Sequence, residues 1–161
     1  MRAVIQRVRQ AEVRIDGLTT AAIGQGLLVF VGIHQTDGPV EIAWMADKLV
    51  HLRIFEDQFG KMNLSLAEIG AAMLIVSQFT LYGDCRKGRR PGFSEAAPPQ
   101  FAAELYQQLI EAVRAKGVAV ATGTFQASMD IHLINSGPVT LTLDTADRTT
   151  LRPREHASSS N

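Results

Sequence analysis

The sequence has 161 residues, of which 46% are hydrophobic and 20% are charged, and its 16 basic and 16 acidic residues cancel. This composition is typical of a single globular domain with a sizeable core and excludes an intrinsically disordered chain. A net charge of zero argues against a protein that grips long nucleic acid through its phosphates, although a local basic patch can still recognise one end.

The first half of the chain predicts a series of strands and one helix. Alternating or β-branched apolar residues favour strands, and the predicted strands cover residues 3–8, 11–16, 19–23, 26–33 and 52–55. The run 26–33 is the most apolar in the chain, which indicates a central strand buried on both faces. Asp37 as cap and Pro39 in the first turn predict a helix whose apolar stripe continues to Val50.

The second half of the chain predicts a further helix among more strands. Ser65 and Glu68 form the pattern of a capping box for a short helical turn, which Gly70 ends. Pro98 introduces a longer helix that stops at Gly117. The predicted strands cover residues 73–76, 118–121, 129–133 and 139–143, and the last two flank a turn at residues 135–138.

Many adjacent strands with two main helices predict an α+β fold. We expect one domain over residues 1–145, with a mainly antiparallel sheet or barrel-like β core and the two main helices packed outside it. The polar segment 146–161 has no periodicity, so we expect a disordered tail. The single cysteine, Cys85, allows no intramolecular disulfide, and the sequence shows no signal peptide or membrane-spanning run, which predicts a cytoplasmic protein.

Polar residues end the buried run 73–76, at Ser77, Gln78 and Thr80 around Phe79. Hydrogen-bonding groups at a rigid strand end suit a binding or catalytic site, but they equally suit a strand end that satisfies its own polar groups. Thr80 is a candidate nucleophile, although a threonine hydroxyl needs a base to activate it. The sequence nominates no residue as that base.

The histidines and the cysteine have no metal-binding spacing, so neither a metal nor another cofactor is expected. A basic cluster, Arg86 to Arg90, carries four cations in five residues. It is interpreted with equal weight as a solvated loop and as a phosphate-binding patch. Arg7 lies among apolar neighbours in a predicted strand, so we expect its guanidinium to be anchored to a specific acceptor.

Two motifs stand far apart in the sequence, Ser77 to Leu81 and Asn135 to Thr140. The Gly137–Pro138 dipeptide of the second predicts, on its residues alone, an ordinary turn with a trans bond. Shorter segments accompany these motifs at residues 5–8, 26–29, 53–55, 60–64, 90–93 and 122–129. Together they resemble, in order and spacing, the motifs of the D-aminoacyl-tRNA deacylase family over roughly residues 1–143.

The resemblance implies a homodimeric hydrolase with a small β-rich fold. Such an enzyme cleaves the ester that joins a D-amino acid to the 3′ end of tRNA, and it also removes glycine mischarged on tRNA(Ala). In the family a Gly-Pro dipeptide with a cis bond enters the site of the partner subunit. Here that dipeptide is Gly137–Pro138, whose carbonyls would face the substrate α-carbon and reject an L side chain.

The resemblance also implies the site residues. The catalytic set is Ser77, Gln78, Phe79 and Thr80, and the set for substrate binding and chiral selectivity is Gly137, Pro138, Arg7, Asn135, Phe125 and Met129. In these roles Arg7 orients the dipeptide, Phe125 and Met129 line the pocket for the terminal adenosine, and the Phe79 amide binds the oxygen of the scissile carbonyl. The attacking group is then water, activated by the terminal 2′-OH of the tRNA.

Two other functions are open at this point. One is a non-catalytic module that binds the 3′ end of tRNA, which would bind charged and uncharged tRNA equally. The other is a small-molecule esterase that uses Thr80 or Ser77, which would hydrolyse simple D-amino-acid esters without tRNA.

Overall fold

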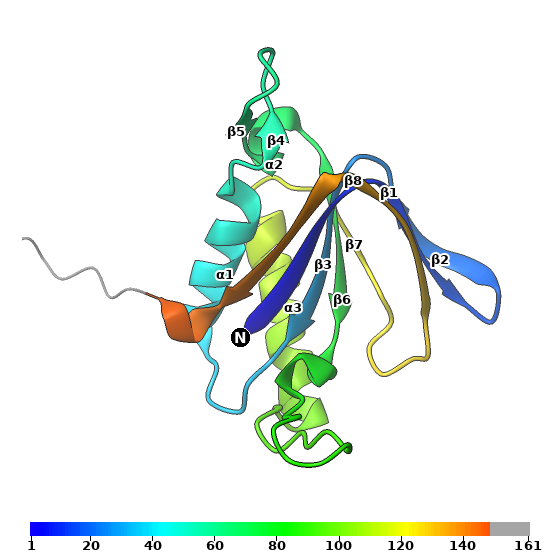
Figure 1. Ribbon diagram of the computed structural model, residues 1–161, viewed down its shortest axis with the longest axis vertical. Coiled ribbons are helices and arrows are strands. Elements are labelled where there is room, and N and C mark those ends of the chain that lie inside the picture. Colours follow the sequence, from blue (N-terminus) through cyan, green and yellow to red (C-terminus); the bar gives the residue numbers. More distant parts are fainter. Residues whose placement is uncertain (149–161) are drawn as a thin grey trace, which may run out of the picture.

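The computed structural model describes residues 1–148, and the final residues of the expected tail, 149–161, lie outside the described part. Figure 1 shows a curved sheet with helices on one side. The strands are β1 (Arg2–Ile15), β2 (Leu18–Ile23), β3 (Gly26–Gly32), β4 (Phe55–Glu56), β5 (Met62–Leu64), β6 (Ala72–Ser77), β7 (Val120–Thr122) and β8 (Asp130–Asp144). The helices are α1 (Pro39–His51), α2 (Leu66–Ile69) and α3 (Pro99–Arg114), with 3₁₀ turns η1 (Phe79–Tyr82) and η2 (Thr145–Asp147).

The main sheet has the strand order β2-β1-β3-β6-β7, and β8 also pairs with β1. Strand β1 is antiparallel to β2, β3 and β8, whereas β3, β6 and β7 are parallel to one another. The α+β class and the barrel-like core are confirmed, since the bent strands β1 and β8 curl the sheet until it is nearly closed (Figure 1). The strand pairings are mainly antiparallel, as expected, but β3, β6 and β7 add a parallel part that the sequence did not predict, with α1 and α3 in the crossovers between its strands.

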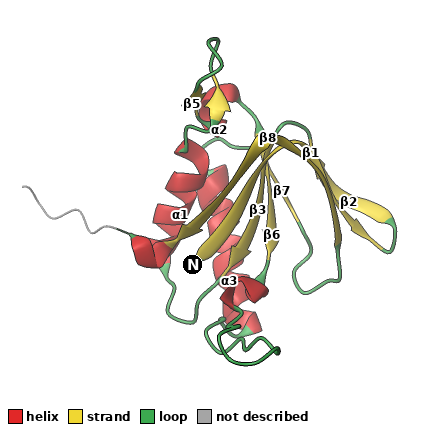
Figure 2. Cartoon of the chain, in the orientation of Figure 1, coloured by secondary structure: helices red, strands yellow, loops and turns green. Residues whose placement is uncertain are grey.

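Consecutive residues of the central strands point into two different cores. Leu27 and Val29 of β3 pack under α1 and α3, while Leu28 faces the hollow of the curved sheet. In β6, Ile75 likewise packs under the helices, and Leu74 faces the hollow of the sheet. Figure 2 shows both long helices on one face of the sheet, so β3 and β6 are buried on both faces, as the run of apolar residues predicts.

The last two predicted strands are one strand, β8, and the predicted turn at residues 135–138 lies inside it. β8 pairs along most of β1, which likewise joins the first two predicted strands. The pairing shifts register between Gln6 and Val8 and again between Val8 and Gln10, opposite the predicted turn. Such irregularities bend a strand without ending it, so the glycine and proline mark a shared bend of two strands.

The start of α1 differs from the expected cap. Gly38 takes the cap position, and its amide donates to the Glu41 carboxylate at 3.0 Å. The carboxylate of Asp37 instead accepts from the buried α-ammonium group of Met1 at 2.6 Å and from the His34 amide at 2.7 Å. The buried α-ammonium group of Met1 is stable only with a partner of opposite charge. Asp37 is that partner, so its side chain does not cap the helix.

The short helix α2 begins as predicted. The Ser65 hydroxyl accepts from the Glu68 amide at 3.3 Å and donates to the Glu68 carboxylate at 2.6 Å, while Gly70 ends the helix in the left-handed conformation. Within residues 1–148, no helix combines the length and the apolar character that crossing a membrane requires.

Candidate functional site

The carboxyl ends of β3, β6 and β7 meet at one edge of the sheet, because the three strands are parallel. A cavity of about 770 Å³ opens at this edge, which is where ligands bind in open parallel sheets. Its walls come from the segments that follow each of the three strands and from the start of α3. The lining residues are Ile33, Gln35, Val76, Ser77, Gln78, Phe79, Phe93, Ser94, Ala96, Ala97, Pro98, Pro99, Ala102, Phe125, Gln126, Ala127, Met129 and Ile131.

The first motif is held against β3 at the cavity wall. The Gln78 amide donates to the Val31 carbonyl at 2.8 Å, which extends the pairing of β6 with β3 by one residue. Gly32 allows this approach, since a Cβ there would lie 3.0 Å from the Gln78 carbonyl oxygen and 3.1 Å from the Leu81 Cβ. The position of Ser77 to Thr80 is therefore set by rigid backbone contacts rather than by a mobile loop.

Two backbone amides of the motif are available to a ligand. The turn η1 begins at Phe79, and the first amides of a helical turn have no carbonyl partner within it. Among the described residues, no carbonyl or side chain accepts a hydrogen bond from the Phe79 or Thr80 amide. Such a pair of amides can stabilise an oxygen that gains negative charge in an ester hydrolysis.

The hydroxyl of Thr80 has an amide, not a base, as its partner. Gln78 donates its side-chain amide to the Thr80 oxygen, and Thr80 itself is exposed just outside the cavity lining. Within residues 1–148, no cluster of three or more histidine, cysteine, aspartate or glutamate side chains is arranged to hold a metal ion. Among the described residues, no carboxylate or imidazole is hydrogen-bonded to the Thr80 hydroxyl.

Phe125 and Met129 form the far side of the cavity, in the segment after β7. The Phe125 ring packs 5.9 Å from the ring of Tyr106, whose hydroxyl donates to the Ile75 carbonyl at 2.7 Å. Burial raises the pKa of the Tyr106 hydroxyl, so it stays a neutral donor. Met129 lies over Gly123, where a Cβ would come within 2.9 Å of the Met129 sulfur. These contacts fix an apolar wall that suits a flat ring.

The second motif lies away from this cavity in the same chain. Arg7 is 6% exposed, and its Nε donates to the Ser136 carbonyl at 3.1 Å while its Nη1 donates to the Ile54 carbonyl at 2.6 Å. Gly137 has a φ of 114°, and a Cβ there would collide with the Arg7 Nη2. The Arg7 guanidinium is therefore anchored to specific backbone acceptors, as its sequence context predicts, and one of them, the Ser136 carbonyl, directly precedes the dipeptide.

The Gly137–Pro138 bond is trans in the structure, as are all the described peptide bonds. The cis bond implied by the family resemblance is therefore not found in the single chain. The dipeptide is exposed and continues β8, where a trans bond is the default. Neither residue lines the cavity that holds Ser77, Gln78 and Phe79.

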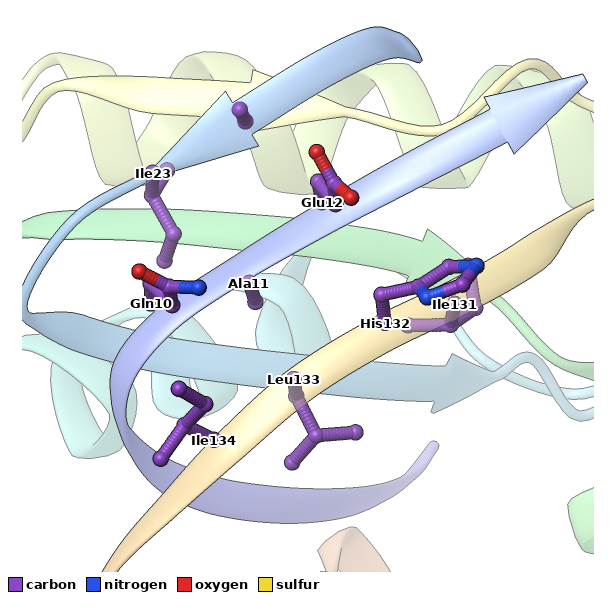
Figure 3. Close-up of a pocket in the computed structure, with 9 residues that line it drawn as sticks. Gln10, Ala11, Glu12, Ile23, Ile131, His132, Leu133 and Ile134 are labelled. Carbon is purple, nitrogen blue, oxygen red and sulfur yellow. The ribbon is translucent and has the colours of Figure 1, made fainter. Parts of the chain in front are cut away.

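A second hollow, of about 630 Å³, lies over strands β1, β2 and β8 (Figure 3). Leu133 and Ile134 line it and are 36% and 48% exposed, and Figure 3 shows them on β8 beside Gln10 of β1. Asn135 follows them, exposed and paired through its backbone with Val8. This apolar stretch of β8 is open to solvent in the single chain.

Sequence reasoning missed part of the cavity wall. Gln35, Phe93 and the Pro98–Pro99 pair line it, although none was a candidate site residue. They come from the segments after β3 and before α3, so the signal that identifies them is the parallel order of the strands. Neighbouring antiparallel strands, which predominate in the expected sheet, do not bring their carboxyl ends to one edge.

The family is decided by comparison with known proteins. Residues 4–144 match the family model described as D-Tyr-tRNA(Tyr) deacylase. The chain belongs to this deacylase family. It is 58% identical over 144 residues to a D-aminoacyl-tRNA deacylase of Anaeromyxobacter dehalogenans and to one of Desulfotalea psychrophila, with 89% of this chain and 97% of each relative covered. A D-aminoacyl-tRNA deacylase of Thermotoga petrophila is 54% identical over 146 residues, which cover 91% of this chain and 98% of that one.

Solved structures agree with the deacylase fold. The chain superposes with a TM-score of 0.84 on a c-Myc DNA unwinding element binding protein, at 38% identity and with 89% of this chain and 98% of that chain covered. A probable eukaryotic D-amino acid tRNA deacylase gives a TM-score of 0.77 at 22% identity, covering 88% of this chain and 97% of that one. The second likeness shows a shared fold.

Proposed function

We propose that this deacylase hydrolyses the ester between a D-amino acid and the 3′ end of tRNA, in the cytoplasm where tRNA is charged. The observation that carries the proposal is that Ser77, Gln78 and Phe79 of the first family motif line one cavity, with the free amides of Phe79 and Thr80 at its edge, in a chain whose family match spans residues 4–144. The cavity is wide enough for an aminoacyl group and a terminal nucleoside, since ligand pockets of about 300–1,000 Å³ are the common range.

In the proposed mechanism the protein positions the ester, and a hydroxyl of the RNA activates the attacking water. The Phe79 and Thr80 amides hold the ester carbonyl oxygen as it becomes an oxyanion. The terminal 2′-OH of the tRNA assists the attack of water, because Thr80 has the Gln78 amide as its partner instead of a base. Phe125 and Met129 pack on the terminal adenine.

We further propose that chirality is read by Gly137 and Pro138 of a second subunit. A backbone wall beside the substrate α-carbon leaves room for hydrogen but not for an L side chain. The same wall accepts glycine, which has no side chain, so glycine mischarged on tRNA(Ala) is also a substrate. Two observations support a homodimer with a shared site: the dipeptide does not line the cavity of its own chain, and Leu133 and Ile134 are exposed.

Deacylation of matched D-tyrosyl-, L-tyrosyl- and glycyl-tRNA tests the proposal. We expect hydrolysis of the D-tyrosyl and glycyl esters and survival of the L-tyrosyl ester. Hydrolysis of simple D-amino-acid esters at the same rate would favour a small-molecule esterase. Equal binding of charged and uncharged tRNA, with ester loss at the background rate, would favour a non-catalytic module.

A further inference from the structure

The loop after η1 carries cations that lack acidic partners. Arg86 is already neutralised, because its guanidinium binds the Asp84 carboxylate through two bonds of 2.8 Å. The same contact holds the pKa of the Asp84 carboxyl well below its usual range. Lys87, Arg89 and Arg90 are exposed, and no carboxylate of residues 1–148 lies within 4.0 Å of their charged nitrogens. Three positive charges thus project from one short segment.

This basic loop, residues 84–92, has a defined shape. Its two ends exchange backbone hydrogen bonds, from the Asp84 amide to the Gly92 carbonyl at 2.7 Å and from the Gly92 amide to the Asp84 carbonyl at 3.0 Å. The Asp84 carboxylate also accepts from the Arg86 amide at 3.0 Å, and Gly88 has the positive φ that a tight turn requires. The free cations are therefore displayed at a closed, narrow loop rather than spread along a free chain.

An exposed aromatic pair joins the basic loop to the cavity. Phe93 follows the loop directly and packs edge-on against Phe79, with ring centroids 5.1 Å apart. The two residues are 38% and 54% exposed, and both line the cavity. Aromatic faces with cations just beyond them form the combination that single-stranded nucleic acid binds, through stacking of bases and contacts to phosphates.

We propose that Lys87, Arg89 and Arg90 bind the phosphates of the RNA strand that leads out of the cavity, and that Phe93 stacks on an unpaired base of that strand. The proposal rests on the proposed function, since the terminal nucleoside must occupy the cavity. It assigns the basic loop to the 3′ strand of the tRNA acceptor arm. An acidic protein would satisfy the cations but leave the exposed rings beside them unused.

The variant K87Q/R89Q/R90Q tests the loop without touching the cavity. We expect its kcat/KM on D-tyrosyl-tRNA at low salt to fall about tenfold or more, because the loop no longer neutralises the phosphates of the RNA strand. The slope of log kcat/KM against log salt concentration should become shallower by about 0.7 for each phosphate that is left without a cation, or about two in all. Hydrolysis of D-tyrosyl-adenosine, which has no phosphates, should be unchanged.

A matched control removes three cations elsewhere. K48Q/K61Q/K116Q makes the same change in net charge, on α1, beside β5 and after α3, and should keep the wild-type salt slope on tRNA. An equal fall in kcat/KM for both variants would show a general effect of charge and overturn the proposal. Unchanged kinetics of K87Q/R89Q/R90Q on tRNA would also overturn it, as would an equal fall on D-tyrosyl-adenosine, which would show damage to the cavity.

Binding of uncharged tRNA separates this proposal from the proposed function. If wild-type protein hydrolyses none of the esters, the catalytic proposal fails, but the salt slope of tRNA binding still tests the loop. A slope that is shallower in K87Q/R89Q/R90Q than in the control variant supports the binding of phosphates by the loop. A slope shared by both variants contradicts it, whatever the hydrolysis assay shows.

Discussion

Thr80 carries a hydroxyl at the rim of the cavity, and its partner is the side-chain amide of Gln78. An amide cannot take up the proton that an attacking hydroxyl must release. Thr80→Ala should therefore hydrolyse D-tyrosyl-tRNA within about tenfold of the wild-type rate, because loss of a group that acts in proton transfer costs about 100-fold or more. Single-turnover deacylation measures this rate.

The companion substrate is tRNA with a 2′-deoxy terminal adenosine. If the RNA hydroxyl assists water, this substrate should react far more slowly than normal tRNA with wild-type protein. The opposite pair of results, loss of turnover in Thr80→Ala and normal reaction of the 2′-deoxy substrate, would make Thr80 the nucleophile.

Arg7 shows how one side chain connects distant parts of the fold. Its guanidinium donates to the carbonyls of Ile54 and Ser136, and it lies 3.5 Å from the Glu56 carboxylate. A planar, permanently charged guanidinium has several N–H donors, so it can bond two backbone segments at once from a buried position between them. An isolated basic residue in an apolar strand predicts such an anchor, but the sequence does not identify the carbonyls it meets.

The short helix α2 depends on the reciprocal contacts of Ser65 and Glu68. Ser65→Ala should lower the free energy of unfolding by about 1 kcal/mol, the usual cost of losing a serine cap. The hydrogen bond from the Ser65 hydroxyl lowers the pKa of Glu68 in the folded state. Its stabilising effect is therefore complete above the unfolded-state pKa of glutamate and is lost as the pH falls through the folded-state pKa.

Urea denaturation of wild type and Ser65→Ala at neutral and acidic pH measures this difference. The stability gap between the two proteins should narrow as the pH falls. A Ser65→Thr control, which keeps a capping hydroxyl, should retain most of the wild-type stability. A gap that stays constant with pH would show that the bond from the Ser65 hydroxyl to the Glu68 carboxylate contributes nothing to stability, since the bond from the Ser65 amide to that carboxylate is present in both proteins.

The elements that the sequence predicts well are those whose local pattern and burial agree. The run 26–33 and the Ser65 cap are of this kind, since both are decided by neighbouring residues. The sequence does not predict the bend in β8. Gly137 and Pro138 favour a turn locally, but pairing with β1 keeps the strand continuous. The cavity was partly predictable: Ser77 to Phe79 end an apolar strand, but Gln35 and Phe93 join them through the parallel strand order.

At the scale of the whole molecule, the second motif does not line the cavity of its own chain, and we propose that it reaches the cavity of a second subunit. Pro138→Ala should loosen the proposed wall and lower the D/L ratio of hydrolysis by about tenfold or more, the factor that about 1.4 kcal/mol of reduced discrimination gives. Rates on D-tyrosyl- and L-tyrosyl-tRNA provide the ratio. An unchanged ratio would remove the dipeptide from chiral selection.

Mixing two variants tests the shared site directly. Gln78→Ala removes a side chain that lines the cavity and belongs to the catalytic set implied by the family resemblance, so it should disable the cavity of its own chain while it still presents an intact Gly137 and Pro138. In mixed dimers these residues would complete the cavity of the Pro138→Ala subunit and restore its preference for D-tyrosyl-tRNA. A D/L ratio that stays low after subunit exchange, with mixed dimers verified by light scattering and native mass spectrometry, would place the dipeptide within its own chain.

The basic loop also makes the neutral protein electrically asymmetric. Residues 84–92 contain four cations and one carboxylate, so the rest of the chain carries an equal excess of negative charge. A polyanion approaching in solution is therefore drawn to one end of the molecule and repelled by the remainder. The loop extends from the end of the sheet at which η1 follows β6 (Figure 1), and Phe93 directly after it lines the cavity, so a polyanion drawn to the loop meets the molecule on the side of the cavity. Association of a polyanion with the loop should accordingly be fast at low ionic strength. A polyanion that contacts any other face should dissociate faster than one bound at the loop.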